Sequence, residues 1–312
     1  MVLVGTFLVL SGCEKAVDST TPTARVGVGN SANIGRYLAF TDRAEFEEAV
    51  HNIDDLLPEE TVDGHLAQWE EQHGNFYSMR KKHAEAAANG DSTACPIEDD
   101  YFAAVVSPEG TVQIADRIYR LDFAQRRIYH IPANRANELY DRMVSNPDSE
   151  EIKYYYFDEA ALDLITTEDQ GTSALVIRIG LGSGFGCGNG AERRVDDDYD
   201  YLANNLRMKC NAEYQKFGIY FSLLAKVKLQ KRTLGIWFSK EACMGIIPDP
   251  GAFWREKCLN YTNYYNAFIG NSCNDNKAVK RYHESTRGLD KYQISVKFET
   301  GNFKSRRYYI NQ

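Results

Sequence analysis

Two Glu-x-x-His steps, Glu48 with His51 and Glu70 with His73, are the pattern that most resembles a reactive centre. Carboxylate-bridged di-iron bundles use two such pairs together with two further inward glutamates. On a helical wheel His51 lies about 140° from Phe46, so we expect it to point into water. His73 falls inside an apolar stripe and is interpreted as a hydrogen-bonded core histidine. No source for the further glutamates is visible, and the sequence predicts no di-iron site.

Glycine occupies every second position from Gly180 to Gly190. A glycine-rich loop after a strand can hold phosphate, but neither G-x-G-x-x-G nor Gly-Lys-Ser/Thr occurs here. We expect instead a flexible loop, or a strand whose bare face lets another backbone approach closely.

A short acidic run imitates the start of a calcium loop, with Asp196, Asp198 and Asp200 in the places of the first ligands. Tyr201 stands where the turn glycine belongs, and Arg207 stands where the bidentate glutamate belongs. We therefore expect a solvated acidic loop, with weak Ca²⁺ binding as the alternative.

No Ser/His/Asp arrangement, H-E-x-x-H step, paired-carboxylate motif or cofactor fingerprint occurs in the chain. The sequence predicts no cofactor, no metal ligand and no catalytic residue. A glycan hydrolase that uses Asp and Glu carboxylates stays open as an alternative, without a located pair.

The element expected to organise the C-terminal half is a strand over 217–229, where every odd position is apolar. Side chains alternate across a strand, so this run predicts one dry face and one wet face of an antiparallel sheet. Exposed tyrosine and tryptophan can stack on sugar rings, and lysines can hold anionic groups. The weak candidates for ligand binding are Tyr214, Lys216, Tyr220, Lys226, Lys228 and Trp237. The alternative is that most of these aromatic residues belong to the core.

The remaining patterns predict an α+β fold: a small helical N-terminal region with a β-hairpin, then a mainly antiparallel β-sandwich or open barrel. Helices are expected to begin at Thr41 or Asp42, to run from about Gly64 to Ala88, and to span 134–144. Strands are expected at 111–121, 127–131, 151–157, 174–179, 234–238, 292–298 and 303–310.

The N-terminus predicts export and lipidation. Val2 to Leu10 is apolar and too short to span a bilayer, which is typical of a signal peptide over 1–12. Leu10-Ser11-Gly12-Cys13 resembles the lipobox of bacterial lipoproteins, so acyl chains on Cys13 would hold the chain on a membrane surface. Residues 13–36 are expected to form a flexible tether.

Charge divides the chain into an acidic and a basic part. Residues 1–170 hold 31 acidic and 14 basic residues, a net charge of −17, and residues 171–312 hold 13 acidic and 22 basic residues, a net charge of +9. Such a change indicates two units, which we place at 37–147 and 148–312. Either the halves face each other or are separately solvated, or the basic half meets a polyanion.

The cysteines fit an oxidising compartment. Of the seven in the chain, six remain besides Cys13, and an even number favours disulfides. A Cys258–Cys273 or Cys243–Cys258 loop is plausible, and buried free thiols are the alternative.

A resemblance to a known family covers about a third of the chain. Trp69-Glu70, Gly74-Asn75-Phe76-Tyr77-Ser78 and Gly110-Thr111-Val112-Gln113-Ile114 with Ile118-Tyr119 resemble the N-terminal region of uncharacterised lipoproteins from Bacteroidetes. In those chains a Gly-Asp turn pair stands where Ala115-Asp116 stands here. The resemblance implies an exported lipoprotein of unknown activity and transfers no catalytic residue.

The combined expectation is a non-enzymatic module, anchored on the outer membrane through Cys13, that binds a glycan or another envelope component and no nucleic acid. The alternatives are the glycan hydrolase and a structural accessory subunit of an envelope complex. A pocket with converging carboxylates would favour the hydrolase, and a flat Tyr/Lys sheet face would favour the binding module.

Overall fold

The structure is a computed structural model that describes residues 36–53, 61–74, 76–91, 93–169, 190–201, 205–257, 259, 262–265, 272–301 and 303–312. The predicted signal peptide and tether, Cys13, the strand over 174–179, most of the glycine run and Cys187 lie outside the described residues. The described chain is an α+β protein whose strands are mostly antiparallel, as predicted.

The N-terminal sheet has the order β1-β2-β3-β4-β5. Its strands are β1 (Ala39–Phe40), β2 (Thr111–Ile114), β3 (Arg117–Asp122), β4 (Arg127–Pro132) and β5 (Lys153–Tyr156). The prediction of one strand over 111–121 was wrong, because the chain turns at Ala115, whose φ of 55° ends β2 and starts a hairpin. β5 also joins this sheet, beyond the expected boundary at residue 147.

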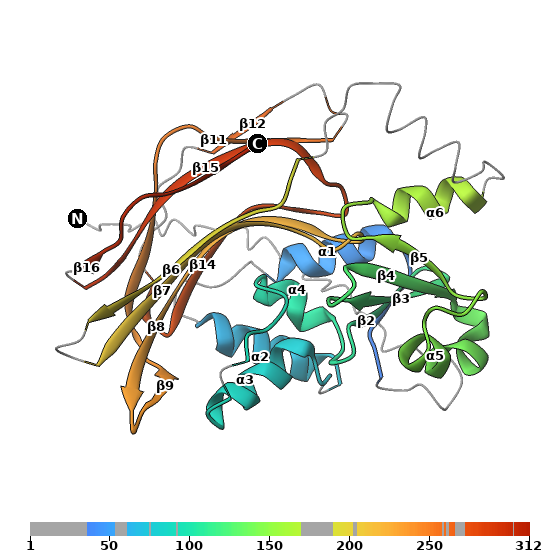
Figure 1. The fold of residues 1–312 in the computed structure, drawn as a ribbon, viewed down its shortest axis with the longest axis horizontal. Helices are drawn as coiled ribbons and strands as arrows, with labels where there is room; N and C mark the ends of the chain where they lie inside the picture. The colour runs from blue at the N-terminus through green and yellow to red at the C-terminus, as the bar shows by residue number, and fades with distance from the viewer. Residues whose placement is uncertain are drawn as a thin grey trace, which may run out of the picture.

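Helices cover this region and the adjoining sheet (Figure 1). They are α1 (Arg43–Asn52), α2 (Val62–Gln72), α3 (Met79–Ala88), α4 (Asp100–Val105), a 3-10 turn (Ala133–Arg135), α5 (Ala136–Ser145) and α6 (Ala161–Asp169). The predicted start of α1 is confirmed, since the Asp42 side chain accepts from the Glu45 amide. The predicted single helix from Gly64 to Ala88 is two helices, because Gly74 has a φ of 74° and Ser78 caps a new helix.

The C-terminal part is a sandwich of two sheets. The inner sheet has the order β14-β8-β7-β6, with β9 on β8, and consists of β6 (Arg193–Tyr201), β7 (Leu206–Lys216), β8 (Phe221–Thr233), β9 (Ile236–Ser239) and β14 (Lys277–Ser285). The outer sheet has the order β12-β11-β15-β10-β13, with β16 and β17 on β15. Its strands are β10 (Ala242–Pro248), β11 (Ala252–Glu256), β12 (Asn263–Tyr265), β13 (Ser272–Asp275), β15 (Leu289–Thr300), β16 (Phe303–Lys304) and β17 (Tyr308–Asn311). Figure 1 shows the inner sheet between the outer sheet and the helices.

β8 confirms the predicted alternation of buried side chains, but the strand starts later than predicted. Its odd side chains from Phe221 to Leu229 are buried in the core between the two sheets. The strand begins at Phe221 rather than at Phe217 because Gly218, with a φ of 75°, turns the chain between β7 and β8. Phe217 and Ile219 instead join the core of the N-terminal region.

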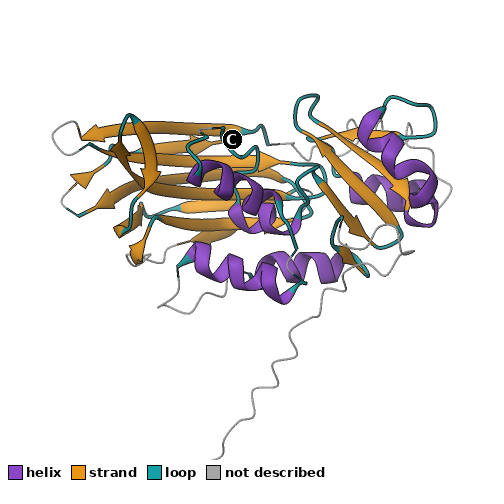
Figure 2. Cartoon of the chain, turned by 90° about the horizontal axis from the view of Figure 1, so that it is seen from below, coloured by secondary structure: helices purple, strands orange, loops and turns teal. Residues whose placement is uncertain are grey.

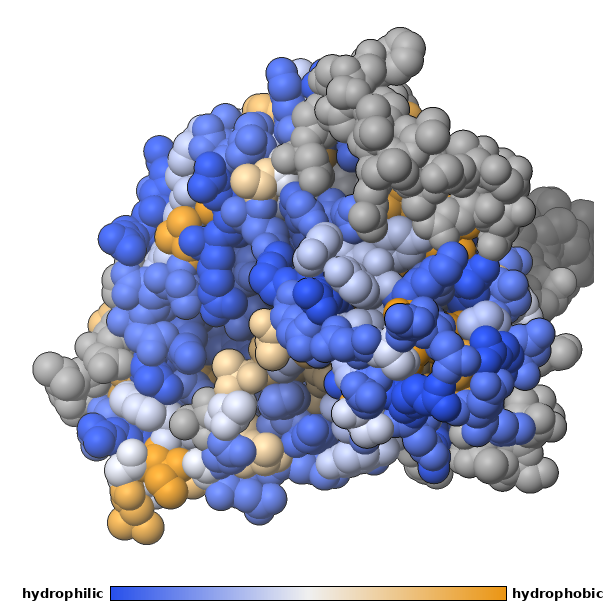
Figure 3. Space-filling model, turned by 45° about the vertical axis from the view of Figure 1, so that its right-hand side comes forward, coloured by the Kyte–Doolittle hydropathy of each residue, from blue (hydrophilic) through white to orange (hydrophobic). Residues whose placement is uncertain are grey.

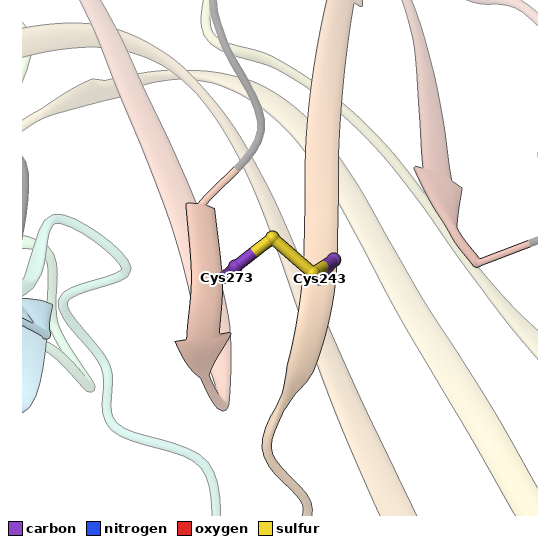
Figure 4. Close-up of a disulfide and its surroundings, with 2 residues drawn as sticks. All are labelled: Cys243 and Cys273. Carbon is purple, nitrogen blue, oxygen red and sulfur yellow. A yellow bond between two sulfur atoms is a disulfide. The ribbon is translucent and has the colours of Figure 1, made fainter.

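One disulfide, Cys243–Cys273, joins β10 to β13 (Figure 4). This disulfide differs from both expected ones, Cys258–Cys273 and Cys243–Cys258. The antiparallel register of β10 and β13 brings together two cysteines that are 30 residues apart in the sequence. Cys95 and Cys210 are free thiols, and Cys258 lies outside the described residues.

Candidate functional site

The face of the inner sheet that was expected to be wet is largely covered. The buried members of the predicted ligand-binding set are Tyr214, Lys216, Tyr220 and Lys226, whereas Lys228 and Trp237 are half-buried. Seen from below, the helices lie across the strands on this side (Figure 2). The expectation of an open Tyr/Lys face over β8 is therefore wrong.

Acidic residues of the N-terminal region explain why this face can be buried. Asp100, the first residue of α4, places Oδ2 2.9 Å from Lys226 Nζ and 3.0 Å from Lys277 Nζ. Asp63 of α2 lies 2.5 Å from Lys277 Nζ. Burial alone would raise the pKa of Asp100, but Lys226 and Lys277 hold it well below its usual value. In turn, the carboxylates of Asp100 and Glu98 raise the pKa of Lys226. Because each buried charge has a partner, the two surfaces can pack together.

Tyr220 belongs to the same interface. Its hydroxyl donates to Asp99 Oδ2 over 2.8 Å, and Arg281 approaches the hydroxyl at 3.4 Å. Asp99 also caps α4, since its side chain accepts from the amides of residues 101 and 102. Burial raises the pKa of Tyr220. The contacts of Tyr220 therefore hold the N-terminal region on the sheet.

Tyr214 faces the other way, into the sandwich. Its ring lies 4.8 Å from that of Tyr292, and its hydroxyl accepts from the Leu289 amide over 2.7 Å. Tyr214 is therefore a core residue. This outcome agrees with the alternative that most aromatic residues of this half are core.

Trp237 keeps a partly exposed ring on β9. The guanidinium carbons of Arg207 and Arg232 lie 4.3 Å and 5.9 Å from the ring centroid. Cations within about 6 Å of an aromatic face are attracted by its quadrupole. Of the predicted set, Trp237 and Lys228 are the two residues that solvent can still reach.

A pocket of about 360 Å³ opens where α1 meets the ends of three strands. Its lining comes from α1, from the turn before β8, and from the ends of β11 and β14: Glu47, Glu48, Val50, His51, Tyr220, Glu256, Glu284 and Ser285. Four of these eight residues are glutamates, so the pocket disfavours anions and suits hydroxyl or amine groups.

The carboxylates of the pocket differ in their surroundings. Burial and the nearby Glu47 raise the pKa of Glu256. Glu47 accepts from the hydroxyl and the amide of Thr286, and Arg43 Nε lies 3.4 Å from it. Two carboxylates in unlike environments are the arrangement that general acid–base chemistry requires.

Two histidines lie beside carboxylates of this pocket, and one of them, His51, lines it. His51 Nδ1 is 2.8 Å from Glu284 Oε1 on the exposed side. His283 is buried, and desolvation lowers its pKa to about 4 although Glu256 lies 4.0 Å away. At neutral pH His283 is therefore uncharged and offers Glu256 no positive charge. Arg287 and Arg43 lower the pKa of Glu256 by less than burial and Glu47 raise it.

The second Glu-x-x-His step has a structural explanation. Glu70 receives two bonds from the Arg80 guanidinium, at 3.0 and 2.5 Å. His73 stacks on Trp69 with ring centroids 3.9 Å apart, and its Nδ1 is 2.7 Å from the Trp69 carbonyl oxygen. Within the described part of the chain, no group of three His, Cys, Asp or Glu residues is placed to hold a metal ion.

The acidic run over 196–200 is a strand and not the expected solvated loop. β6 pairs with β7 along its length, from Arg193↔Tyr214 to Tyr201↔Leu206. Arginines neutralise its acidic side chains, with Arg207 Nη1 3.2 Å from Asp198 Oδ2 and Arg306 Nη2 3.0 Å from Asp197 Oδ2. These ion pairs and the strand geometry do not form a calcium loop.

An open aromatic face does exist, on the outer sheet. Register places Phe253 beside Tyr264 and Gln293, and places Ser295 beside Tyr309. Partners in an antiparallel pair share a face, and so do residues two apart in a strand. We call Phe253, Tyr264, Gln293 and Tyr309 the tyrosine face.

The tyrosine face points away from the sandwich core. Tyr264 is 68% exposed and Tyr309 is 47% exposed, while Tyr292 and Ile294 on the opposite side of β15 are buried. The Phe253 and Tyr264 rings lie 6.3 Å apart, and the Tyr309 hydroxyl donates to Gln293 Oε1 over 3.0 Å. Lys291 and Lys297 alternate with the buried side chains of the same strand. The face thus combines flat rings with hydrogen-bonding groups.

Sequence reasoning missed both the pocket and the tyrosine face. The pocket joins α1 to segments that lie at least 169 residues further along the chain, so no local spacing reveals it. Tyr264 and Tyr309 are 45 residues apart in the sequence, and only the pairing of β12, β11, β15 and β17 brings them to one surface.

Comparison with known proteins adds little. No protein-family profile and no curated protein matches the chain. One solved structure, a DUF4848 family protein from Bacteroides thetaiotaomicron, is 9% identical over 92% of this chain and 98% of that chain, with a TM-score of 0.22. A TM-score this low does not show a shared fold. Among the described helices, none is both long and apolar enough to cross a bilayer.

Proposed function

We propose that this chain is a lipoprotein of the cell envelope, anchored through Cys13, whose tyrosine face binds a glycan. The observation that carries the proposal is the exposure of Tyr264 and Tyr309 on one face of the outer sheet, with Phe253 beside Tyr264. Exposed aromatic rings on a rigid sheet offer a flat apolar surface at little entropic cost. The lipobox resemblance of residues 10–13 supports the location.

The polar groups beside the rings supply the hydrogen bonds that a sugar needs. Gln293 can use its amide hydrogens while its oxygen accepts from Tyr309. Lys291 and Lys297 favour a neutral or anionic chain over a cationic one. We therefore retain the prediction of a glycan ligand, but propose that it binds to the outer sheet and not to β8.

The direct test is a glycan array followed by titration calorimetry on the full chain carrying Cys13→Ser. We expect Tyr264→Ala and Tyr309→Ala each to weaken binding about tenfold, as central aromatic anchors do. Tyr309→Phe keeps the ring and should retain most of the affinity. Tyr154→Ala removes an exposed tyrosine from β5, outside the tyrosine face, and serves as the control. No binding to any glycan, or an equal loss in the control, would count against the proposal.

A second candidate function, glycan hydrolysis in the glutamate-lined pocket, is favoured by the raised pKa of Glu256 beside Glu47. A carboxyl whose pKa is raised can act as general acid beside a second carboxyl that acts as base or nucleophile. Glu256→Gln should then lower turnover of a susceptible polysaccharide at least about 100-fold. The exposed Glu241→Gln should leave it unchanged. Equal turnover in Glu256→Gln and the unchanged chain would exclude this function.

A further inference from the structure

The β8–β9 hairpin ends in an apolar tip that the fold does not explain. Leu234 and Gly235 form its two-residue turn, since Thr233 pairs with Ile236. Both turn residues have positive φ, 50° and 88°, which such turns usually assign to asparagine, aspartate or glycine. Leu234 is 98% exposed. A leucine here is unfavourable for the backbone and gains no burial, so its presence points to contact with something outside the chain.

The tip is held out rigidly from the body. β9 and the end of β8 project at the lower left of Figure 1. Figure 3 shows hydrophobic atoms gathered at the lower-left tip of a mostly hydrophilic surface. Ile236, 43% exposed, packs beside Gly90 at the end of α3: a Cβ added to Gly90 would lie 3.4 Å from the nearest Ile236 methyl. The hairpin is therefore fixed against the helices while its end stays free.

Cationic side chains follow the tip along both strands of the hairpin. Lys231 and Arg232 precede it on β8, and Lys240 follows it after β9, all three exposed. Lys231 lies three residues, or about 10 Å, behind Leu234 along the strand. Trp237 pairs with Arg232 across the hairpin and lies one residue pair nearer to the tip than Lys231. Glu241 is the single acid in 230–241.

We infer that this hairpin inserts its tip into an anionic lipid bilayer. From the tip inwards come Leu234, then Trp237 level with Arg232, then Lys231 and Lys240. This order matches that of acyl chains, interface and headgroup phosphates in a bilayer. Interfacial elements bury their apolar part about 5–10 Å deep, which places Lys231 at the phosphates when Leu234 enters the acyl region. The contact is independent of the acyl chain expected on Cys13, and it would fix the orientation of the protein on the surface.

The test is sedimentation of the full chain, with Cys13→Ser in every sample, together with vesicles of phosphatidylcholine with or without phosphatidylglycerol. Hydrogen exchange over 231–239 provides a local readout that other apolar segments of the chain do not affect. We expect slower exchange in this segment with phosphatidylglycerol vesicles, little change with neutral ones, and loss of the effect at high salt.

Variants assign the contact to the hairpin. Leu234→Glu should reduce the bound fraction at least tenfold and abolish the slower exchange. Lys231→Gln with Lys240→Gln should reduce binding severalfold and flatten its salt dependence. Tyr264→Glu makes the same change of charge at another exposed site and should bind like the unchanged chain. Unaltered exchange over 231–239, equal binding of neutral vesicles, or a Leu234→Glu effect on self-association without one on vesicle binding would overturn the inference.

Discussion

Asp100 is the side chain on which the packing of helices against the inner sheet depends most. It sits between Lys226 and Lys277, each within 3.0 Å, and all three side chains are buried. Removing one member of such a group leaves charges buried without a partner, which costs far more than the pair contributes.

We therefore expect Asp100→Asn to lower the free energy of unfolding by about 3–5 kcal/mol, measured by urea denaturation. Asp141→Asn is the control, because the Arg36–Asp141 pair is exposed on both sides and such pairs contribute about 0–1 kcal/mol. Adding Lys277→Met to Asp100→Asn should recover part of the loss. Equal stability of the two single variants would contradict this account.

His283 should make stability depend on pH in the acid range. Burial lowers its pKa from 6.5 to about 4, so between these values the unfolded chain binds a proton that the folded chain does not. This contribution to stability is complete above pH 6.5 and is lost as the pH falls towards 4, by up to about 3 kcal/mol. Chemical denaturation from pH 7 to pH 4 should show a shallower decline for His283→Gln. Parallel curves for both proteins would refute the assignment.

The contacts of individual side chains could be predicted from the sequence only where both partners are close along the chain. The Asp42 cap was predictable because its partner lies three residues away. The partners of Asp100 lie 126 and 177 residues away, and the acidic lining of the pocket comes from three separate segments. No periodicity or spacing links such side chains.

At the scale of elements, glycine decides where strands and helices stop. The alternation over 217–229 correctly predicted the buried side of β8 but extended through a turn, because Phe217 and Ile219 are buried in a different core. Likewise, the apolar stripe of the predicted helix from Gly64 to Ala88 continues through the break between α2 and α3. A pattern of burial does not reveal which core buries a residue.

Gly218 offers the sharpest test at this scale. Its φ is 75°, and an added Cβ would lie 3.1 Å from Ile128 Cγ2. Gly251 has a φ of 93° with nothing within 4 Å of an added Cβ. We expect Gly251→Ala to lower the free energy of unfolding by about 1 kcal/mol, and Gly218→Ala by about 1–2 kcal/mol more. Thermal and urea denaturation would show the order, and the reverse order would disprove the tight turn.

At the scale of the molecule, the charge difference between the halves has a direct structural basis. Asp63, Glu98 and Asp100 from the acidic part face Lys226, Lys277 and Arg194 from the basic part. This confirms the alternative in which the halves face each other. The fold class was predictable because alternation and caps are local signals; the burial of one sheet face under the helices was not, because it depends on these distant ion pairs.

The same arrangement leaves the outer sheet as the accessible side of the sandwich. The tyrosine face and the tip of the β8–β9 hairpin are both on surfaces that the N-terminal region does not cover. The proposed ligand site therefore lies on the side of the sandwich that the helices leave open.

Lysine footprinting of the folded chain tests most directly the central claim that the helices bury one face of the inner sheet. A brief reaction with an amine-acylating reagent, read by mass spectrometry, should modify Lys209 and Lys304, whose side chains are 47% and 66% exposed, and spare Lys226 and Lys277, at 3% and 5%. In Asp100→Asn the two spared lysines should gain reactivity. If Lys226 in the unchanged protein reacts as fast as Lys304, the face is open and the account is wrong.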